Sequence, residues 1–152
     1  MKIQDAPGLK AAYNPHLVYK PNYTTGRARC SFDLRLDPGA HLFYEWRSWD
    51  VNPYRIGPSL WIRDGKLTVN GRELLGLPTG QWLHIEITAR VGASADGKWE
   101  LSVQLPGQEP RRFPGLAVAH PEFKNLTWTG WCSMATDKTA FYLDNVQVKN
   151  EP

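Results

Sequence analysis

The stretch FYLDNVQV at residues 141–148 has the aromatic, aliphatic and polar order of a β-strand near the end of the chain. It follows a long series of short alternating segments that are separated by Gly, Pro, Asn and Asp residues. Short strands with such turn residues between them are typical of an all-β sandwich or barrel. The sequence therefore predicts an all-β domain whose last strand lies at residues 141–148.

The alternation is clearest at residues 28–36, where every second side chain is apolar: Ala28, Cys30, Phe32, Leu34 and Leu36. Residues 60–75 contain Asp64-Gly65 and Asn70-Gly71, which favour two-residue hairpin turns and so predict a three-stranded meander. Residues 82–91 and 99–105 alternate on either side of Asp96-Gly97. We predict a two-sheet antiparallel β-sandwich of about nine or ten strands, with no helix longer than about two turns.

Length and charge limit the classes of partner. A chain of 152 residues fits one domain, spanning residues 1–152. The net charge of +3 is spread along the chain without a basic stripe, so we expect no nucleic-acid partner. No apolar run has membrane-spanning length, so no membrane partner is expected. Met1 is followed directly by Lys2-Ile3-Gln4-Asp5, as at the edge of a domain, and we expect a domain from a larger secreted or periplasmic protein whose signal peptide lies outside this chain.

Two cysteines do not make a disulfide framework. Cys30 and Cys132 both occupy apparently inward strand positions. Two buried free thiols are the favoured interpretation, with a bridge as the alternative.

The order of elements carries a resemblance. A strand near residue 30, the entry Gly80-Gln81-Trp82 into a core strand, a partner strand across Asp96-Gly97 and a closing strand with Asp144 follow one another. This order resembles the concanavalin A-like lectin/glucanase superfamily, which includes laminin-G-like domains and accessory modules of bacterial polysaccharide-degrading proteins. The resemblance covers residues 3–150 by pattern. It implies a jelly roll in which the last strand pairs with the first, and a role connected with polysaccharides.

A laminarinase-type glycosidase would carry Glu-x-Asp-x-x-Glu, with two carboxylates directed into one cleft. No Glu in this sequence is followed two residues later by Asp. Glu45 and Glu86 remain the closest pair, either facing each other across a sheet or, as we expect, forming salt bridges with Arg47, Arg63 and Arg90. The histidines, His16, His41, His84 and His120, lack metal-ligand spacing.

A glycan-binding surface needs exposed rings for stacking and polar groups for hydroxyls. Strand alternation places eight candidates on one polar and aromatic face: Glu45, Arg47, Trp61, Arg63, His84, Glu86, Arg90 and Trp131. The loop at residues 46–55 adds Trp49, Tyr54 and Arg55, as a sugar cradle or as a self-packed loop. Trp82, Trp99 and Trp128 are predicted to lie in the core. The arginines favour an anionic ligand, such as a uronic-acid or sulfated glycan.

The resemblance also implies a structural calcium ion, held by Asp144 of the closing strand with an acidic residue near the N-terminus, here Asp5. The alternative is that Asp144 caps a turn or pairs with a basic residue.

Three functions follow from these observations. The first is a non-catalytic carbohydrate-binding module that recognises a polysaccharide. The second is a glycan-active hydrolase or lyase, with Glu45, Glu86 and His84 as its candidate groups. The third is a structural sandwich that packs against a neighbouring catalytic domain.

Overall fold

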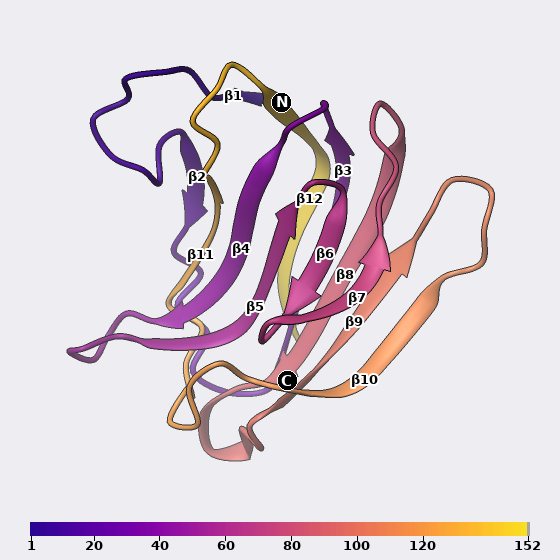
Figure 1. Ribbon diagram of the computed structural model, residues 1–152. Coiled ribbons are helices and arrows are strands. Elements are labelled where there is room, and N and C mark those ends of the chain that lie inside the picture. Colours follow the sequence, from indigo (N-terminus) through magenta and orange to yellow (C-terminus); the bar gives the residue numbers. More distant parts are fainter. Residues whose placement is uncertain (152) are drawn as a thin grey trace.

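A computed structural model describes residues 1–151 as two six-stranded antiparallel sheets that form the two layers of a sandwich (Figure 1). Sheet A has the order β1-β12-β3-β8-β9-β10, and sheet B has the order β2-β11-β4-β5-β6-β7. The strands are β1 (Lys2–Gln4), β2 (His16–Tyr19), β3 (Arg27–Leu36), β4 (His41–Ser48), β5 (Arg55–Arg63), β6 (Lys66–Val69), β7 (Arg72–Gly76), β8 (Trp82–Arg90), β9 (Lys98–Gln104), β10 (Arg111–Ala117), β11 (Trp128–Ser133) and β12 (Ala140–Glu151).

The predicted all-β sandwich is therefore confirmed. Helical structure in the described chain amounts to one 3₁₀ turn at Gly92–Ser94. The twelve strands in residues 1–151 exceed the nine or ten that the sequence predicted. The patterns of β1 and β2 are too short to be counted from sequence, and that of β10 is interrupted by a bulge. Residues 1–151 contain no helix with the length and apolar character needed to cross a membrane.

The last strand joins the first, as the resemblance implied. On one side of β12, Phe141 and Tyr142 lie opposite Ile3 and Lys2 of β1. On the other side, β12 pairs with β3 from the Phe141–Leu36 pair to the Glu151–Arg27 pair. The C-terminal strand is therefore an interior strand of sheet A, bonded on both edges.

The core lies between the sheets and follows the predicted alternation. Sheet A buries the apolar set of β3 together with Leu83, Ile85 and Ile87 of β8. Sheet B contributes Leu42, Tyr44 and Trp46 of β4 and the apolar side of β5. Burying each large apolar side chain of this kind contributes roughly 1.5–3 kcal/mol to stability.

Trp131 corrects one assignment. It was expected on the outer face, with Cys132 turned inward, but Trp131 is fully buried and its ring lies 4.9 Å from that of Phe32. The pairing of β11 with β4 sets Trp131 opposite Tyr44, which faces the core. Alternation in β11 was misassigned because neighbouring Trp131 and Cys132 are both apolar, so hydrophobicity alone does not fix the inward side.

The three tryptophans that were predicted to lie in the core have different outcomes. Trp82 alternates with the buried Leu83 and lies 42% exposed on the outer face of sheet A. Trp128 is buried as predicted, but it packs with Phe43 and Cys132 in a small cluster on the outer side of sheet B and not between the sheets. Trp99 is in the core as predicted, and its indole nitrogen donates to the carbonyl of Ala117 at 2.9 Å.

The predicted hairpins and thiols are confirmed. Asp64, Gly65, Asn70 and Gly71 all have positive φ angles, which the two-residue turns on either side of β6 require. Cys30 and Cys132 are both free and buried. Cys30 lies in the main core, whereas Cys132 lies with Phe43 and Trp128 on the outer side of sheet B.

Candidate functional site

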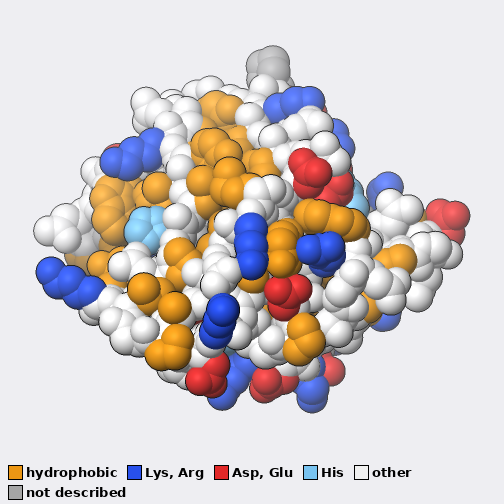
Figure 2. Space-filling view, turned by 90° about the horizontal axis from the view of Figure 1, so that it is seen from above, with side chains coloured by type: hydrophobic (Ala, Val, Ile, Leu, Met, Phe, Trp, Pro, Cys, Tyr) orange, Lys and Arg blue, Asp and Glu red, His pale blue; other side chains and the backbone are white. Residues whose placement is uncertain are grey.

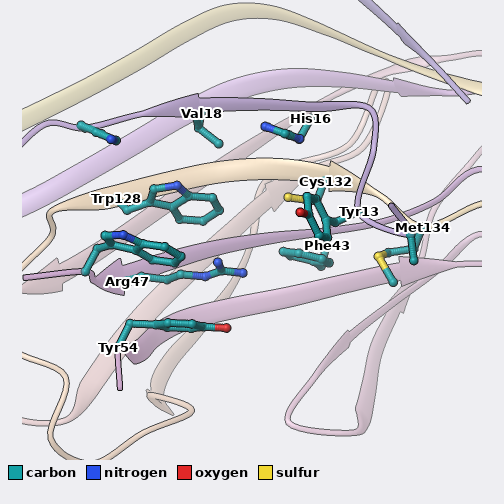
Figure 3. Close-up of a pocket in the computed structure, with 12 residues that line it drawn as sticks. Tyr13, His16, Val18, Phe43, Arg47, Tyr54, Trp128, Cys132 and Met134 are labelled. Carbon is teal, nitrogen blue, oxygen red and sulfur yellow. The ribbon is translucent and has the colours of Figure 1, made fainter. Parts of the chain in front are cut away.

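The outer face of sheet B contains a cleft of about 600 Å³ (Figure 3). Its walls come from β2, β11 and β4 of the sheet, from the loop between β4 and β5, and from the segment before β2. The lining residues are Ala12, Tyr13, His16, Val18, Lys20, Phe43, Arg47, Trp49, Tyr54, Trp128, Cys132 and Met134. A cavity of this size accommodates a small ligand or a short part of a polymer.

Arg47 lies at one end of the cleft among aromatic rings. Its guanidinium carbon is 4.1 Å from the ring centre of Trp128 and 4.7 Å from that of Tyr54. Figure 3 shows the side chain extending between these two rings. Trp49 stacks on Tyr54 with a centroid distance of 4.7 Å and on Trp128 at 6.0 Å. The rings and the cation hold one another, so this end of the cleft is preorganised.

Gly130 explains how Trp128 lies against the sheet. Trp128, Gly130 and Cys132 share the outer side of β11, with glycine in the middle. A Cβ atom at position 130 would lie 2.9 Å from Cη2 of Trp128 and 2.9 Å from the carbonyl oxygen of Leu17. The missing side chain therefore leaves the space that the indole ring occupies.

The loop between β4 and β5 is fixed by hydrogen bonds to residues 124–127. The hydroxyl of Ser48 donates to the carbonyl of Asn125 and accepts from the backbone amides of Lys124 and Asn125. The carboxylate of Asp50 accepts from the Asn125 side chain at 2.7 Å. The backbone amide of Trp49 donates to the Thr127 hydroxyl at 2.6 Å. These bonds hold Trp49 at the cleft wall although its side chain is half exposed.

Glu45 lies beneath Arg47. Nε and Nη2 of Arg47 are 2.8 and 2.7 Å from one carboxylate oxygen of Glu45. The other oxygen accepts a long hydrogen bond, 3.4 Å, from Ser59. Glu45 is 4% exposed, so its charge is compensated inside the sheet face and not offered to the cleft. Within residues 1–151 the guanidinium has no other hydrogen bond, so Nη1 is left without a hydrogen-bond partner there.

The opposite end of the cleft is formed by Tyr13, His16, Cys132 and Met134. The rings of Tyr13 and His16 are 5.9 Å apart, and Nδ1 of His16 is 2.9 Å from the side-chain oxygen of Asn14. Burial raises the pKa of the Cys132 thiol to about 11. The charge of Arg47 lowers this pKa and the charge of Glu45 raises it, each by less than burial does. The thiol is therefore neutral at pH 7.

The structure brings together three of the predicted binding residues and places two more next to them. Arg47, Trp49 and Tyr54 line the cleft. Glu45 lies below Arg47, and the ring of Trp61 lies 4.9 Å from the ring of the cleft residue Phe43. Trp61 therefore extends the aromatic surface along β5. Arg63 lies farther along β5, where it is exposed beside Asp64 at 3.6 Å.

The single polar face that the sequence predicted does not exist as one surface. His84, Glu86 and Arg90 belong to β8 and lie on the outer face of sheet A, on the opposite side of the sandwich. His84 is 2.6 Å from Asp33, and Glu86 forms an ion pair with Arg29. Strand alternation separates inner from outer faces, but it does not tell which sheet a strand joins.

The carboxylates considered for catalysis are also separated. Glu45 and Glu86 lie on the outer faces of different sheets. The expected salt bridge of Glu45 with Arg47 is confirmed, whereas Glu86 pairs with Arg29 and not with the arginines that the sequence suggested.

Arg55 turns away from the cleft lining. Its Nε donates to Glu122 at 2.8 Å, and its guanidinium also donates to the carbonyl of Pro53. The hydrogen bond and charge of Arg55 lower the pKa of Glu122. Arg55 therefore supports the base of the loop that carries Tyr54.

The two carboxylates expected to share a calcium ion lie at different places. The backbone amide of Asp5 donates to the carbonyl of Thr139, whereas Asp144 lies opposite Asp33 of β3 and accepts from the backbone amide of Asn145. In residues 1–151 no group of three or more His, Cys, Asp or Glu side chains could hold a metal ion. Asp5 nevertheless has one buried carboxylate oxygen, Oδ2, with no hydrogen-bond partner among the described residues. An unpartnered buried carboxylate oxygen of this kind is a candidate cation ligand.

Sequence analysis missed over half of the cleft lining: Ala12, Tyr13, His16, Val18, Lys20, Phe43, Trp128, Cys132 and Met134. β2 has four residues and gives too short a pattern to be recognised. The motif Trp-Thr-Gly-Trp-Cys at residues 128–132 did carry a signal. A glycine two residues after a tryptophan removes the side chain on the same face, which is where a ring can lie flat along the strand.

No protein-family model matches this chain, and no curated protein matches it. Several solved structures have a similar fold. An endo-β-1,4-glucuronan lyase from the fungus Trichoderma reesei has a TM-score of 0.59 and 10% identity, over 99% of this chain and 80% of that one. The alginate lyase vAL-1 from Chlorella virus has a TM-score of 0.54 and 11% identity, over 99% and 84% of the two chains. The PL-14 alginate lyase from Aplysia kurodai has a TM-score of 0.52 and 10% identity, over 99% and 98%. At this identity the likeness shows a shared sandwich fold.

Proposed function

We propose that this domain is a carbohydrate-binding module that holds an acidic polysaccharide of the uronic-acid type in the cleft of sheet B. One observation carries the proposal. The cleft has an aromatic wall, and the basic side chains that line it within residues 1–151 are Lys20, Arg47 and His16, with no Asp or Glu in the lining.

Each component has a role in binding such a chain. Trp49 and Tyr54 are partly exposed and offer apolar ring surface against which a pyranose ring packs. The free edge of Arg47 and the ammonium of Lys20 offer hydrogen bonds and charge to carboxylates of the ligand. Because Glu45 already neutralises part of Arg47, the attraction depends on a directed hydrogen bond as well as on net charge.

The structural comparisons support this choice of ligand class. The three structures with the TM-scores given above bear the names of a glucuronan lyase and of two alginate lyases. Glucuronan and alginate are both polymers of uronic acids. A ligand of this kind is met outside the cytoplasm, which supports the proposal that the domain acts in a secreted or periplasmic protein.

Hydrolysis is the weaker of the two enzymatic alternatives. Glycoside hydrolases generally need two carboxyl groups on either side of the scissile bond. Among the described residues the cleft lining supplies none, and Glu45 is held in its ion pair with Arg47.

A lyase is the second candidate because Tyr13 and His16 line the same cleft as Arg47. In β-elimination a base removes the proton on C5 of the uronate while a cation stabilises the carboxylate. The C4–O bond then breaks, the leaving oxygen takes a proton, and a C4–C5 double bond forms. Tyr13 or His16 would act as base and acid, and Arg47 would hold the carboxylate.

The binding experiment uses isothermal titration of the whole chain with an alginate or glucuronan tetrasaccharide, and with a neutral mannotetraose of equal length. We expect binding of the acidic ligands only, weakened about tenfold or more by Trp49→Ala and weakened by Lys20→Gln. Tyr19→Ala is the matched aromatic control, because Tyr19 is 39% exposed on the opposite side of β2 from Val18 and Lys20. Lys98→Gln, on β9 of the other sheet, is the charge control.

Equal binding of mannotetraose, or equal loss in the control variants, would overturn the proposal. Absence of binding to every glycan in a folded protein would favour the third function, in which the aromatic cleft packs against a neighbouring catalytic domain. The lyase candidate is tested in the same samples by the ultraviolet absorbance of the unsaturated product. Its appearance in wild type and its loss in Tyr13→Phe or His16→Gln would replace a binding role with a catalytic one.

A further inference from the structure

A row of alternating cationic and aromatic side chains crosses the outer face of sheet A, on the opposite side of the sandwich from the cleft. Lys2 of β1 lies opposite Tyr142 of β12, Tyr142 lies opposite Arg35 of β3, and Arg35 lies opposite Trp82 of β8. The four residues are thus direct cross-strand neighbours. We refer to them as the sheet A row.

The contacts within the row are cation–π contacts. The ammonium of Lys2 is 5.9 Å from the Tyr142 ring centre, and the guanidinium carbon of Arg35 is 4.0 Å from the same centre. On its other side Arg35 is 5.5 Å from the ring centre of Trp82. Arg35 is therefore held between two rings.

Neither cation in the row has an anionic partner. Across residues 1–151, no carboxylate lies within 4.0 Å of the charged atoms of Lys2 or Arg35. Nε of Arg35 is buried and makes no hydrogen bond to a described residue. The carboxylate of Asp37 lies near the row, but it accepts from the hydroxyl of Tyr142 at 3.2 Å.

Two titratable side chains on this face are paired with acids. Arg29 forms an ion pair with Glu86, and His84 is 2.6 Å from Asp33. Arg35 instead has two rings that fix its position and leave its terminal nitrogens without partners.

We propose that the sheet A row is a second binding site for carboxylate-bearing sugars. The terminal nitrogens of Arg35 bind one carboxylate, Lys2 binds another, and Trp82, which is 42% exposed, stacks on a sugar ring. Lys2 and Arg35 are two strands apart, or about 10 Å. That separation is comparable to a disaccharide repeat in an extended 1,4-linked uronate chain, so one chain running across the strands can reach both cations.

The row lies at the end of sheet A where β3 ends and β8 begins. Figure 2 shows this end of the molecule, and basic side chains are set among patches of hydrophobic ones there. A polymer can approach the row because Lys2 and Trp82 are exposed. With the cleft on sheet B, the domain would carry two sites on opposite faces and could bridge two polysaccharide chains.

This inference rests on the proposed function in one respect, namely that the ligand is an acidic glycan. The test is nuclear magnetic resonance of the whole chain with ¹⁵N-labelled tryptophan, titrated with an alginate tetrasaccharide. The indole signals of Trp82 and Trp49 report on the two sites separately and are assigned with Trp82→Phe and Trp49→Phe. We expect both signals to shift, and we expect the Trp82 shift to persist in Trp49→Ala.

Arg35→Gln is expected to weaken the response of Trp82 about tenfold and to leave that of Trp49 unchanged. Lys2→Gln, at an exposed position, tests the same site without disturbing the stacked guanidinium. Unchanged positions of the remaining indole signals show that each variant is folded.

The outcomes separate the two proposals. A shift of Trp49 alone would overturn the second site and leave the proposed function standing. A shift of Trp82 alone would establish the second site and refute the cleft. If neither signal moves, both proposals fail. An equal shift of Trp82 with mannotetraose would overturn recognition of carboxylates by the row.

Discussion

The guanidinium of Arg47 lies 4.1 Å from the ring centre of Trp128, although 81 positions of sequence separate the two residues. β4 and β11 are neighbours in sheet B, and Arg47 and Trp128 are direct partners in their register. The cation–π contact is therefore a cross-strand pair on the outer face of the sheet. It joins β4, which carries the Glu45–Arg47 ion pair, to β11, which carries Trp128.

This pair leads to a prediction about stability. Arg47→Met leaves the carboxylate of Glu45 buried and without its cation, and we expect the free energy of unfolding to fall by about 3 kcal/mol. The double variant Arg47→Met with Glu45→Leu removes both charges and should recover most of this loss. Urea denaturation of the wild type, both single variants and the double variant measures the coupling. Additive effects of the two substitutions would contradict it.

Gly130→Ala is expected to reshape the cleft. The added methyl group would meet the Trp128 ring and the Leu17 carbonyl at 2.9 Å each, and the backbone oxygen has little freedom to move. We expect a loss of about 1–3 kcal/mol in stability and weaker binding of the acidic tetrasaccharide. Gly76→Ala is the control, because a Cβ there has no heavy atom within 4 Å. The control should change stability by less than about 0.5 kcal/mol.

The two thiols predict a pH dependence on the alkaline side. Burial raises the pKa of Cys132 to about 11 and that of Cys30 to about 12, from an ordinary value of 9.0. The folded protein thus holds these protons more tightly than the unfolded chain. Their contribution to stability is complete below pH 9 and declines as the pH rises toward 11 or 12.

Urea midpoints measured below pH 9 and between pH 9 and 11 test this prediction. Tyrosines and lysines also titrate in this range, so the informative quantity is the difference between wild type and Cys132→Ala at each pH. We expect this difference to diminish as the pH rises. A difference that stays constant with pH would show that the folded thiol titrates like that of an unfolded chain.

Calcium binding remains a prediction, and Asp5 is the residue at which we test it. The buried Oδ2 of Asp5, which has no hydrogen-bond partner within residues 1–151, would coordinate a calcium ion together with main-chain carbonyl oxygens. We expect calcium to raise the unfolding temperature of the wild type and a chelator to reverse the rise. Asp5→Asn should abolish the effect and Asp144→Asn should not. A calcium response that survives in Asp5→Asn would place the ion elsewhere.

Much of the fold was accessible from sequence because the relevant signals are local. The alternation of β3 and β8 and the Asp-Gly and Asn-Gly turns depend on residues that are near one another in the chain. β2 was missed because four residues carry too little periodicity, and β1, with three residues, was expected only from the resemblance. These short strands form only because long neighbouring strands, β11 and β12, offer them free edges.

The site was less accessible, since it depends on which sheet each strand joins. Arg47, Trp49 and Tyr54 were found because they are close together in one loop region. His84 and Glu86 were grouped with them because they have the right alternation, but β8 belongs to the other sheet. Trp128 and Trp131 were exchanged because their side chains are equally apolar, and only the pairing with Tyr44 decides which of them points inward.

The interior position of β12 has a consequence for biosynthesis. β12 is a neighbour of both β3 and β1 in sheet A, and it is the only strand of the described chain with which β1 pairs. Both strands therefore lack this partner until β12, residues Ala140–Glu151, has left the ribosome. Sheet A therefore cannot form sequentially during translation, and the nascent chain exposes an unpaired edge of β3 until synthesis of this segment is complete. Truncation before residue 140 should leave an aggregation-prone chain, and folding in the cell should depend on chaperones that protect it during this interval.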